Sequence, residues 1–190
     1  GDVVIKGLEE PYAKRTVEGD LGMRYSALGV LKSLSEEELM LINEEEQVDL
    51  EKELIYRSQN VDCVFKVGDD QRIDALIGGI CTDKAMSRHV GKMEEVYTPM
   101  GVLYNQTGKD LSKITCVIGT GGILVRSSYP KKILEKLLYN KNLPMELRPV
   151  EPRFLLDADY ILASMGLLSE IDPLLALKIM KKHIKPISNI

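Results

Sequence analysis

The sequence is poor in the residues that build metal centres and hydrolase triads. It has no tryptophan, two histidines and three cysteines among 190 residues. Cys63, Cys81 and Cys116 lie far apart and form no Cys-x-x-Cys pair. This spacing indicates thiols used as small apolar residues in a reducing cytosol, rather than a zinc site or a disulfide framework. Since His89 and His183 are the two histidines, spacing assembles no Ser-His-Asp or Cys-His arrangement, and such a hydrolase is a poor explanation.

Long apolar runs and a strong charge imbalance are also missing. No stretch approaches the roughly 18 consecutive apolar residues that a membrane span requires. A formal net charge of −4 argues against a generic nucleic-acid-binding surface. The composition, 44% hydrophobic and 28% charged, is typical of a globular domain with enough chain for a substantial core. We therefore expect a cytoplasmic protein that binds neither membrane nor nucleic acid.

What the sequence does contain is a β-rich run that ends in a glycine cluster. Residues 115–118, Thr-Cys-Val-Ile, favour a buried strand, since such residues fit a pleated surface. Gly-Thr-Gly-Gly at 119–122 follows where a strand of an α/β sheet reaches its carboxyl end, the usual place for a ligand. Glycine permits positive φ and lets a ligand approach the backbone. Neither a Walker A loop nor a complete dinucleotide fingerprint is present, so a tight strand-to-helix turn without a ligand is the alternative.

The first half of the chain indicates one short strand and several helices. A strand is expected at 3–6. Apolar periodicity predicts the longest helix over 69–89, and a capping box formed by Ser35 and Glu38 opens an earlier helix. The acidic run at 44–46 fits the start of a further helix, where carboxylates complement the macrodipole.

The second half continues this pattern, with a short strand or turn expected at 100–103. Prolines punctuate a loop at 144–152, Asp157 or Asp159 opens a helix, and Asp172 followed by Pro173 begins the last helix. A few strands separated by many helices indicate an α/β fold that is rich in helix.

Two separated motifs resemble those of the superfamily of actin, Hsp70 chaperones and sugar kinases (ASKHA). Residues 19–24, GDLGMR, are similar to its Gly-Asp-x-x-Leu-Gly-Gly turn, and residues 117–122 resemble its adenosine motif, a strand that ends in Gly-Gly before a helix. More closely, four segments resemble the glutamate mutase accessory family of the MutL/GlmL type, which is unrelated to the mismatch-repair protein of similar label. They are KRTVEGDLGMRYSA, RHVGK, GKDLSKITCVIGTGGIL and LLDADYILASMGLL, and the similarity spans nearly the whole chain.

The resemblance implies an α/β, ribonuclease H-like or actin-like lobe with a central mixed sheet, flanking helices and a helical insertion at approximately 35–95. Full-length relatives have two such lobes with ATP in the cleft between them. The Asp-x-Gly-Ser/Thr phosphate loop of the N-terminal lobe has no counterpart here. Residues 1–190 are therefore interpreted as most of the C-terminal lobe, a fragment that carries the adenosine side of the site. ATP or ADP with Mg²⁺ is the cofactor expected of the full-length protein.

The glycine cluster supplies the first set of candidate nucleotide-binding residues. The resemblance places adenosine or the α-phosphate against the backbone of Gly119, Gly121 and Gly122, and Thr120 is a candidate for a hydroxyl hydrogen bond.

The GDLGMR segment supplies a second set of candidates near the phosphates, formed by Gly19, Asp20 and Gly22. Asp20 is the candidate to hold a Mg²⁺-bound water, because Mg²⁺ keeps several waters and uses few carboxylates. Its alternative role is the N-cap of the next helix. No direct metal ligand and no catalytic residue is predicted.

The third set ends the long helix. Arg88, His89 and Lys92 are candidates for a wall of the adenine and ribose pocket. The alternative is a basic helix C-terminus stabilised by the dipole.

Three arginines, Arg15, Arg24 and Arg126, are further candidates for offsetting phosphate charge, with ordinary ion pairs as the alternative.

The resemblance implies an ATP-binding accessory protein of chaperone or reactivating-factor type for an adenosylcobalamin-dependent glutamate (methylaspartate) mutase. The mutase subunits are the expected partners, and self-association is left open. A small-molecule kinase of the same superfamily and a scaffold lobe without catalysis are the alternatives. A weak ATPase is expected of the full-length protein alone, because phosphoryl transfer needs positioning from both lobes.

Overall fold

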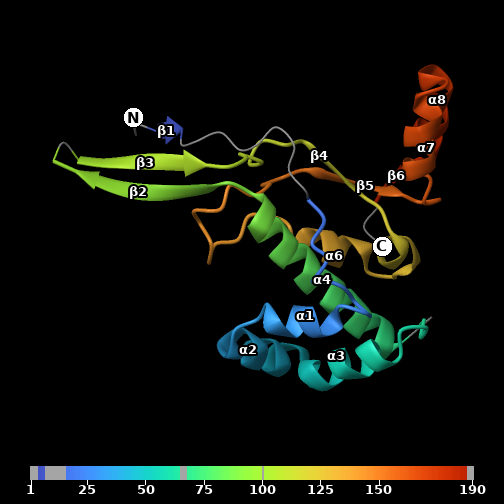
Figure 1. Cartoon of the computed structure of the whole chain (residues 1–190), viewed down its shortest axis with the longest axis horizontal. Coiled ribbons are helices and arrows are strands. Elements are labelled where there is room, and N and C mark those ends of the chain that lie inside the picture. Colours follow the sequence, from blue (N-terminus) through green and yellow to red (C-terminus); the bar gives the residue numbers. More distant parts are fainter. Residues whose placement is uncertain (1–3, 7–15, 65–67, 100, 188–190) are drawn as a thin grey trace.

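Two small sheets and a layer of helices make up the described part of the chain (Figure 1). The computed structural model describes residues 4–6, 16–64, 68–99 and 101–187. The elements are β1 (Val4–Lys6), α1 (Ala27–Lys32), α2 (Glu36–Glu46), α3 (Leu50–Gln59), α4 (Asp69–His89), β2 (Lys92–Thr98), β3 (Gly101–Thr107), β4 (Cys116–Gly119), α5 (Gly122–Arg126), α6 (Pro130–Glu135), β5 (Arg153–Asp157), α7 (Leu162–Ser169), α8 (Pro173–His183) and β6 (Ile184–Pro186). Among the described residues, no helix has the length and apolarity to cross a membrane.

The first sheet is built on a long hairpin, for which the sequence predicted no more than a short strand or turn at 100–103. Its order is β1-β3-β2, with β2 antiparallel to β3 from Lys92 opposite Thr107 to Thr98 opposite Gly101. β1 adds in parallel to β3, and it confirms the strand predicted at 3–6 for the residues described there, Val4–Lys6. The hairpin projects away from the helices (Figure 1).

The second sheet has the order β4-β5-β6, with β5 parallel to β4 and antiparallel to β6. β4 confirms the strand predicted before the glycine cluster. The expectation of one central sheet is wrong for the described residues, which form two sheets of three strands. The physical reason lies in the connection after β3, because the carbonyl of Lys109 accepts from the Gly91 amide and the Leu111 amide donates to Leu147, so no ladder continues into β4. The coarser prediction of mixed α/β structure rich in helix is confirmed.

α4 lies between two hydrophobic clusters and organises the helical layer. One cluster joins its Ile73, Ile77 and Ile80 to α1 and α3, and the other joins its Ala75 to α5 and α6. The predicted bounds of this helix, 69–89, are confirmed. Gly79 serves close packing, since a Cβ there would lie 3.1 Å from Lys136 Cγ, whereas a Cβ on Gly78 would make ordinary contacts at 3.5 Å or more. Cys81 on the same helix is partly buried, and this burial raises the pKa of its thiol to about 11, as expected of a thiol used as an apolar residue.

One predicted helix boundary, the one based on the acidic run at 44–46, is wrong. The capping box predicted at Ser35 and Glu38 is confirmed and starts α2. That helix continues to Glu46, so the acidic run forms its last turn rather than the start of another helix. Carboxylates there oppose the macrodipole. The Arg72 guanidinium, 2.9 Å from Glu46, offsets part of that cost.

Candidate functional site

The glycine cluster forms the predicted strand–turn–helix connection. β4 ends at Gly119, and α5 begins at Gly122. Gly121 precedes the helix with a φ of 108°, a conformation that strains any residue with a Cβ. The turn therefore requires glycine at 121 whether or not it binds a ligand.

The three glycines of this turn have different surroundings. Gly119 is buried, and a Cβ there would lie 2.9 Å from Leu124 Cδ1 and 3.0 Å from Leu134 Cδ1. Its role in the structure is close packing. In contrast, no atom lies within 4 Å of a Cβ built on Gly121 or Gly122. These two positions leave the backbone accessible to a ligand.

Thr120 ties the turn to the start of α7. Its hydroxyl donates to Asp157 Oδ2 at 3.0 Å, and the buried Asp157 carboxylate also accepts from the amides of Ile161 and Leu162 at 3.0 Å. Burial opposes ionisation of Asp157, but the hydrogen bonds from Leu162, Ile161 and Thr120 outweigh it and hold its pKa below the usual range. The prediction that Asp157 or Asp159 opens this helix is wrong in position, because α7 begins at Leu162 with Ile161 as its N-cap, and Asp157 instead anchors the first amides from the end of β5. A hydrogen bond from Thr120 to a ligand stays a prediction.

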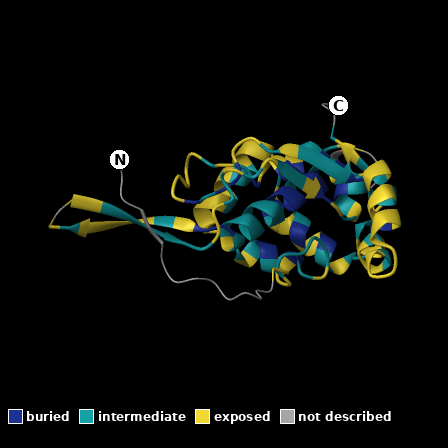
Figure 2. Cartoon of the chain, turned by 90° about the horizontal axis from the view of Figure 1, so that it is seen from above, coloured by how far each residue is buried: buried dark blue, intermediate teal, exposed yellow. Residues whose placement is uncertain are grey.

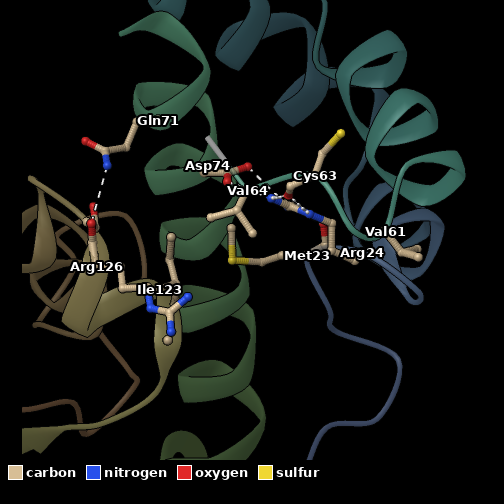
Figure 3. Close-up of a pocket in the computed structure, with 11 residues that line it drawn as sticks. Met23, Arg24, Val61, Cys63, Val64, Gln71, Asp74, Ile123 and Arg126 are labelled. Atoms are coloured by element: carbon tan, nitrogen blue, oxygen red, sulfur yellow. Dashed lines mark hydrogen bonds and ion pairs between the residues drawn. The ribbon is translucent and has the colours of Figure 1, made fainter. Parts of the chain in front are cut away.

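A pocket of about 290 Å³ opens beside the turn (Figure 3). This volume is at the lower end of the range of roughly 300–1,000 Å³ typical of small-molecule sites. α5 forms one side, the segment before α1 and the segment after α3 form another, and α4 closes the base. The lining residues are Met23, Arg24, Val61, Cys63, Val64, Gln71, Asp74, Gly122, Ile123, Arg126 and Ser127.

A buried charge cluster supports the pocket, and of its members only Arg24 was a candidate from the sequence. Asp74 on α4 lies 2.8 Å from Arg24 Nη2 and 2.7 Å from Arg57 Nε, and the Arg57 side chain is fully buried. Arg57 also pairs with Glu53, and Arg24 donates to the carbonyl of Cys63 at 3.1 Å. Arg24, predicted as a partner for phosphate, therefore holds the pocket wall together. An aspartate between apolar residues of α4 was the available signal.

Arg126 stands at the rim of the pocket. Figure 3 shows its guanidinium beside Ile123, across from Met23 and Arg24. The Gln71 amide donates to the Arg126 carbonyl at 3.3 Å, and this bond fastens the end of α5 to α4. Within the described part of the chain, the exposed Arg126 guanidinium makes no ion pair.

The structure brings together two of the predicted segments in an ion-pair cluster outside the pocket. Arg88 lies 2.8 and 2.9 Å from the two carboxylate oxygens of Asp20 and 2.7 Å from Glu18. Hydrogen bonds to Asp20 and Glu18 raise the pKa of Arg88, and the bond from Arg88 lowers the pKa of Asp20. The alternative role of Asp20 as an N-cap is wrong, because α1 begins at Ala27 with Ser26 as its N-cap.

The neighbouring candidates Gly19 and Gly22 lie on the same loop as Asp20, and neither lines the pocket. A Cβ on Gly22 would lie 3.0 Å from Ser26 Cβ, whereas a Cβ on Gly19 would meet open space.

Lys92 and His89 lie where α4 ends and the β2–β3 hairpin begins. Lys92 Nζ lies 3.2 Å from Glu146, which also accepts from Arg148 Nε at 2.6 Å. His89 is the last residue of α4, as the helix-terminus alternative requires. Neither residue lines the pocket beside the turn. Arg15 falls outside the described residues.

Comparison with known proteins identifies the family. The MutL protein family matches residues 1–184 of the chain. Protein MutL of Clostridium tetanomorphum is 44% identical over 182 residues, which cover 96% of this chain and 39% of that relative. No solved structure matches. The chain thus spans well under half of the relative's length, but the match to the family extends over nearly all of the chain. The chain belongs to the MutL protein family, the glutamate mutase accessory family that its motifs resemble.

Proposed function

We propose that this chain is the adenosine-binding lobe of an ATP-binding accessory protein for an adenosylcobalamin-dependent glutamate (methylaspartate) mutase. The observation that carries the proposal is the open backbone of Gly121 and Gly122, one of which lines the pocket. Family membership supports the accessory role. The full-length protein would act as a chaperone or reactivating factor of the mutase.

The chemistry of the pocket suits a nucleoside. Ile123, Met23 and Val64 provide apolar surface for a flat base, and the absence of a Cβ at Gly122 lets ribose or the α-phosphate approach the main chain. The guanidinium of Arg126 is a cation within the same lining, suited to phosphate oxygens by its fork of donors. Hydrophobic walls with few polar groups are typical of cofactor pockets.

Mg²⁺ would be held through a bound water rather than by direct side-chain ligands. No group of three or more acidic, cysteine or histidine side chains suited to a metal occurs among the described residues. A water-mediated contact to Asp20 fits the preference of Mg²⁺ for few carboxylates. Both Asp20 oxygens accept from Arg88, so a Mg²⁺-bound water would compete with that guanidinium.

Nucleotide would influence a partner through differential binding to two conformations. The Thr120–Asp157 hydrogen bond joins the candidate nucleotide turn to α7. A ligand that moves the turn therefore acts directly on the helix that Asp157 anchors.

Calorimetric titration of the 190-residue chain with ATP and ADP tests the site. We expect Gly122→Val to weaken binding at least tenfold, because it fills space that the ligand would use. Gly166→Val on α7 is the matched control, since its Cβ also meets open space, away from the pocket. Absence of binding at about 1 mM nucleotide would contradict the proposal and favour a scaffold lobe. The accessory role is tested separately by co-purification of the full-length protein with the mutase subunits.

A further inference from the structure

α7 and α8 form a helical hairpin that stands on the second sheet (Figure 1). α7 follows β5, α8 runs into β6, and Asp157 of β5 pairs with Ile184 of β6. Both helices are therefore anchored at the sheet, and the turn that joins them, 170–172, lies at the far end. The two helices pack against each other.

The hairpin exposes large apolar side chains. Leu167, Ile171 and Leu174 are 72%, 85% and 79% exposed, and Leu175 and Leu177 are also exposed. Figure 2 shows these helices mostly in the colour of exposed residues. α7 has no buried residue among those described, and Ala176 is the buried residue of α8. Clustered apolar exposure of this kind marks an interaction surface.

Charge is distributed unevenly along the hairpin. Lys181, Lys182 and Lys185 are exposed at the sheet end, and none of them is in an ion pair within the described part of the chain. Glu170 and Asp172 are exposed in the turn at the far end. Two carboxylates lie near the lysines: Asp157 is buried and accepts from main-chain amides, and Asp159 lies 2.5 Å from His183. The sheet end of the surface is thus basic and the turn is acidic, and the exposed Lys178 lies between them on α8.

We propose that the hairpin pairs with the same hairpin of a second copy of this chain, in an antiparallel, two-fold arrangement. Two-fold pairing brings the acidic end of each hairpin to the basic end of the other. If Leu174 and Leu177 lie at the axis, Glu170, four residues before Leu174, faces Lys181, four residues after Leu177. This contact occurs twice per dimer, and the leucines between the two contacts are covered.

The charges favour a second copy over a lipid surface. An anionic bilayer would attract the lysines, but it would repel Glu170 and Asp172 beside Ile171, the most exposed apolar residue of the hairpin. Two helical hairpins also pack readily as a four-helix arrangement. Helices of 8 and 11 residues are about 12 and 17 Å long, so the interface falls below the standard size. The expected dissociation constant is about 10–100 µM, which is weak for a dimer.

Sedimentation velocity of the 190-residue chain between about 5 and 500 µM tests the pairing, and a rise from monomer to dimer is expected. Leu174→Ser should abolish the rise. Leu41→Ser on α2 is the matched control, because Leu41 is 55% exposed and lies outside the hairpin, and it should leave association unchanged. Circular dichroism verifies that both variants remain folded. A chain that stays monomeric throughout, or a dimer insensitive to Leu174→Ser, would overturn the proposal.

Charge exchange tests the orientation. Glu170→Lys and Lys181→Glu should each weaken dimerisation roughly three- to tenfold at low salt, since each places like charges opposite one another twice. An equimolar mixture of the two variants should restore the wild-type affinity, because both contacts in the mixed dimer then join opposite charges. A mixture no tighter than either variant would exclude the antiparallel arrangement. Flotation with phosphatidylserine vesicles distinguishes the lipid alternative, and binding there without dimerisation would also overturn the proposal.

Discussion

Gly29 on α1 lies directly against the main-chain carbonyl of Asp20, and a Cβ on Gly29 would be 2.0 Å from that oxygen. A neighbour made of backbone cannot rotate away as the end of a long side chain can. The loop that carries Asp20 therefore keeps its position only because residue 29 is glycine.

Gly29→Ala should destabilise the fold by about 1–3 kcal/mol, the usual cost of overpacking. The better helix propensity of alanine returns about 1 kcal/mol at most. Gly166→Ala on α7 is the control, since its Cβ meets open space and the change should be neutral or stabilising. Urea denaturation of both variants measures the difference. Equal stability of Gly29→Ala and the wild type would show that the loop can move away at little cost.

Asp74→Asn should destabilise the protein by about 3–5 kcal/mol, because it removes the buried carboxylate 2.7 Å from the guanidinium of the fully buried Arg57. Arg24 would lose the same partner, so the pocket wall should loosen as well. Asp62→Asn, an exposed change on the nearby segment, serves as the control and should alter stability by less than about 0.5 kcal/mol. Chemical denaturation gives both values, and a loss below 1 kcal/mol for Asp74→Asn would argue that water replaces the carboxylate.

The lowered pKa of Asp157 predicts a stability contribution that depends on pH. A carboxyl group whose pKa falls on folding stabilises the protein above its unfolded value, near 3.8, and loses that contribution as pH falls through the folded value. The stability difference between the wild type and Asp157→Asn should therefore be constant from about pH 5 to 8 and shrink below about pH 4.

Thr120→Val removes one hydrogen bond to Asp157 and leaves the two amide bonds in place. It should cost about 1 kcal/mol at neutral pH, less than Asp157→Asn. Denaturation curves across this pH range measure both variants. A difference between wild type and Asp157→Asn that grew on acidification would contradict the direction of the pKa shift.

Cys81 should react slowly with iodoacetamide in the folded protein. With a pKa of about 11, only about a thousandth of the thiol is thiolate at pH 8. Peptide mapping by mass spectrometry, with the native and urea-unfolded chains compared, measures the protection. Labelling of Cys81 at the same rate in both states would show that the helix opens readily at this position.

Local signals were sufficient for several elements of the fold. The capping box at Ser35, the apolar periodicity of 69–89 and the Asp172–Pro173 start of α8 each act within a few residues, and each was predicted correctly. The β2–β3 hairpin had no such signal. β2 is mostly exposed, with Glu94 and Glu95 adjacent in its middle, so its sequence lacks the alternation of a half-buried strand.

The candidate site likewise combines features that were predicted from the sequence with features that depend on tertiary packing. The glycine turn was predicted from its residues, but its division into a packed Gly119 and an open Gly121 and Gly122 depends on Leu124 and Leu134, which reach it through tertiary packing. Asp74 meets Arg24 across 50 residues of sequence, and Arg88 meets Asp20 across 68. Pairings at such separations follow from the packing of α4, and no local sequence pattern predicts them.

The single uninterrupted run of α4 links two distant sets of contacts. Its 21 residues span about 30 Å, with Gln71 and Asp74 at the pocket and Ser87 and Arg88 at the opposite end. When a rigid helix of that length tilts slightly at one end, its other end is displaced by a larger distance. A tilt of about 5° at the pocket would displace the far end by about 2 Å, enough to break the contacts of Arg88 with Asp20 and of Ser87 with Glu146.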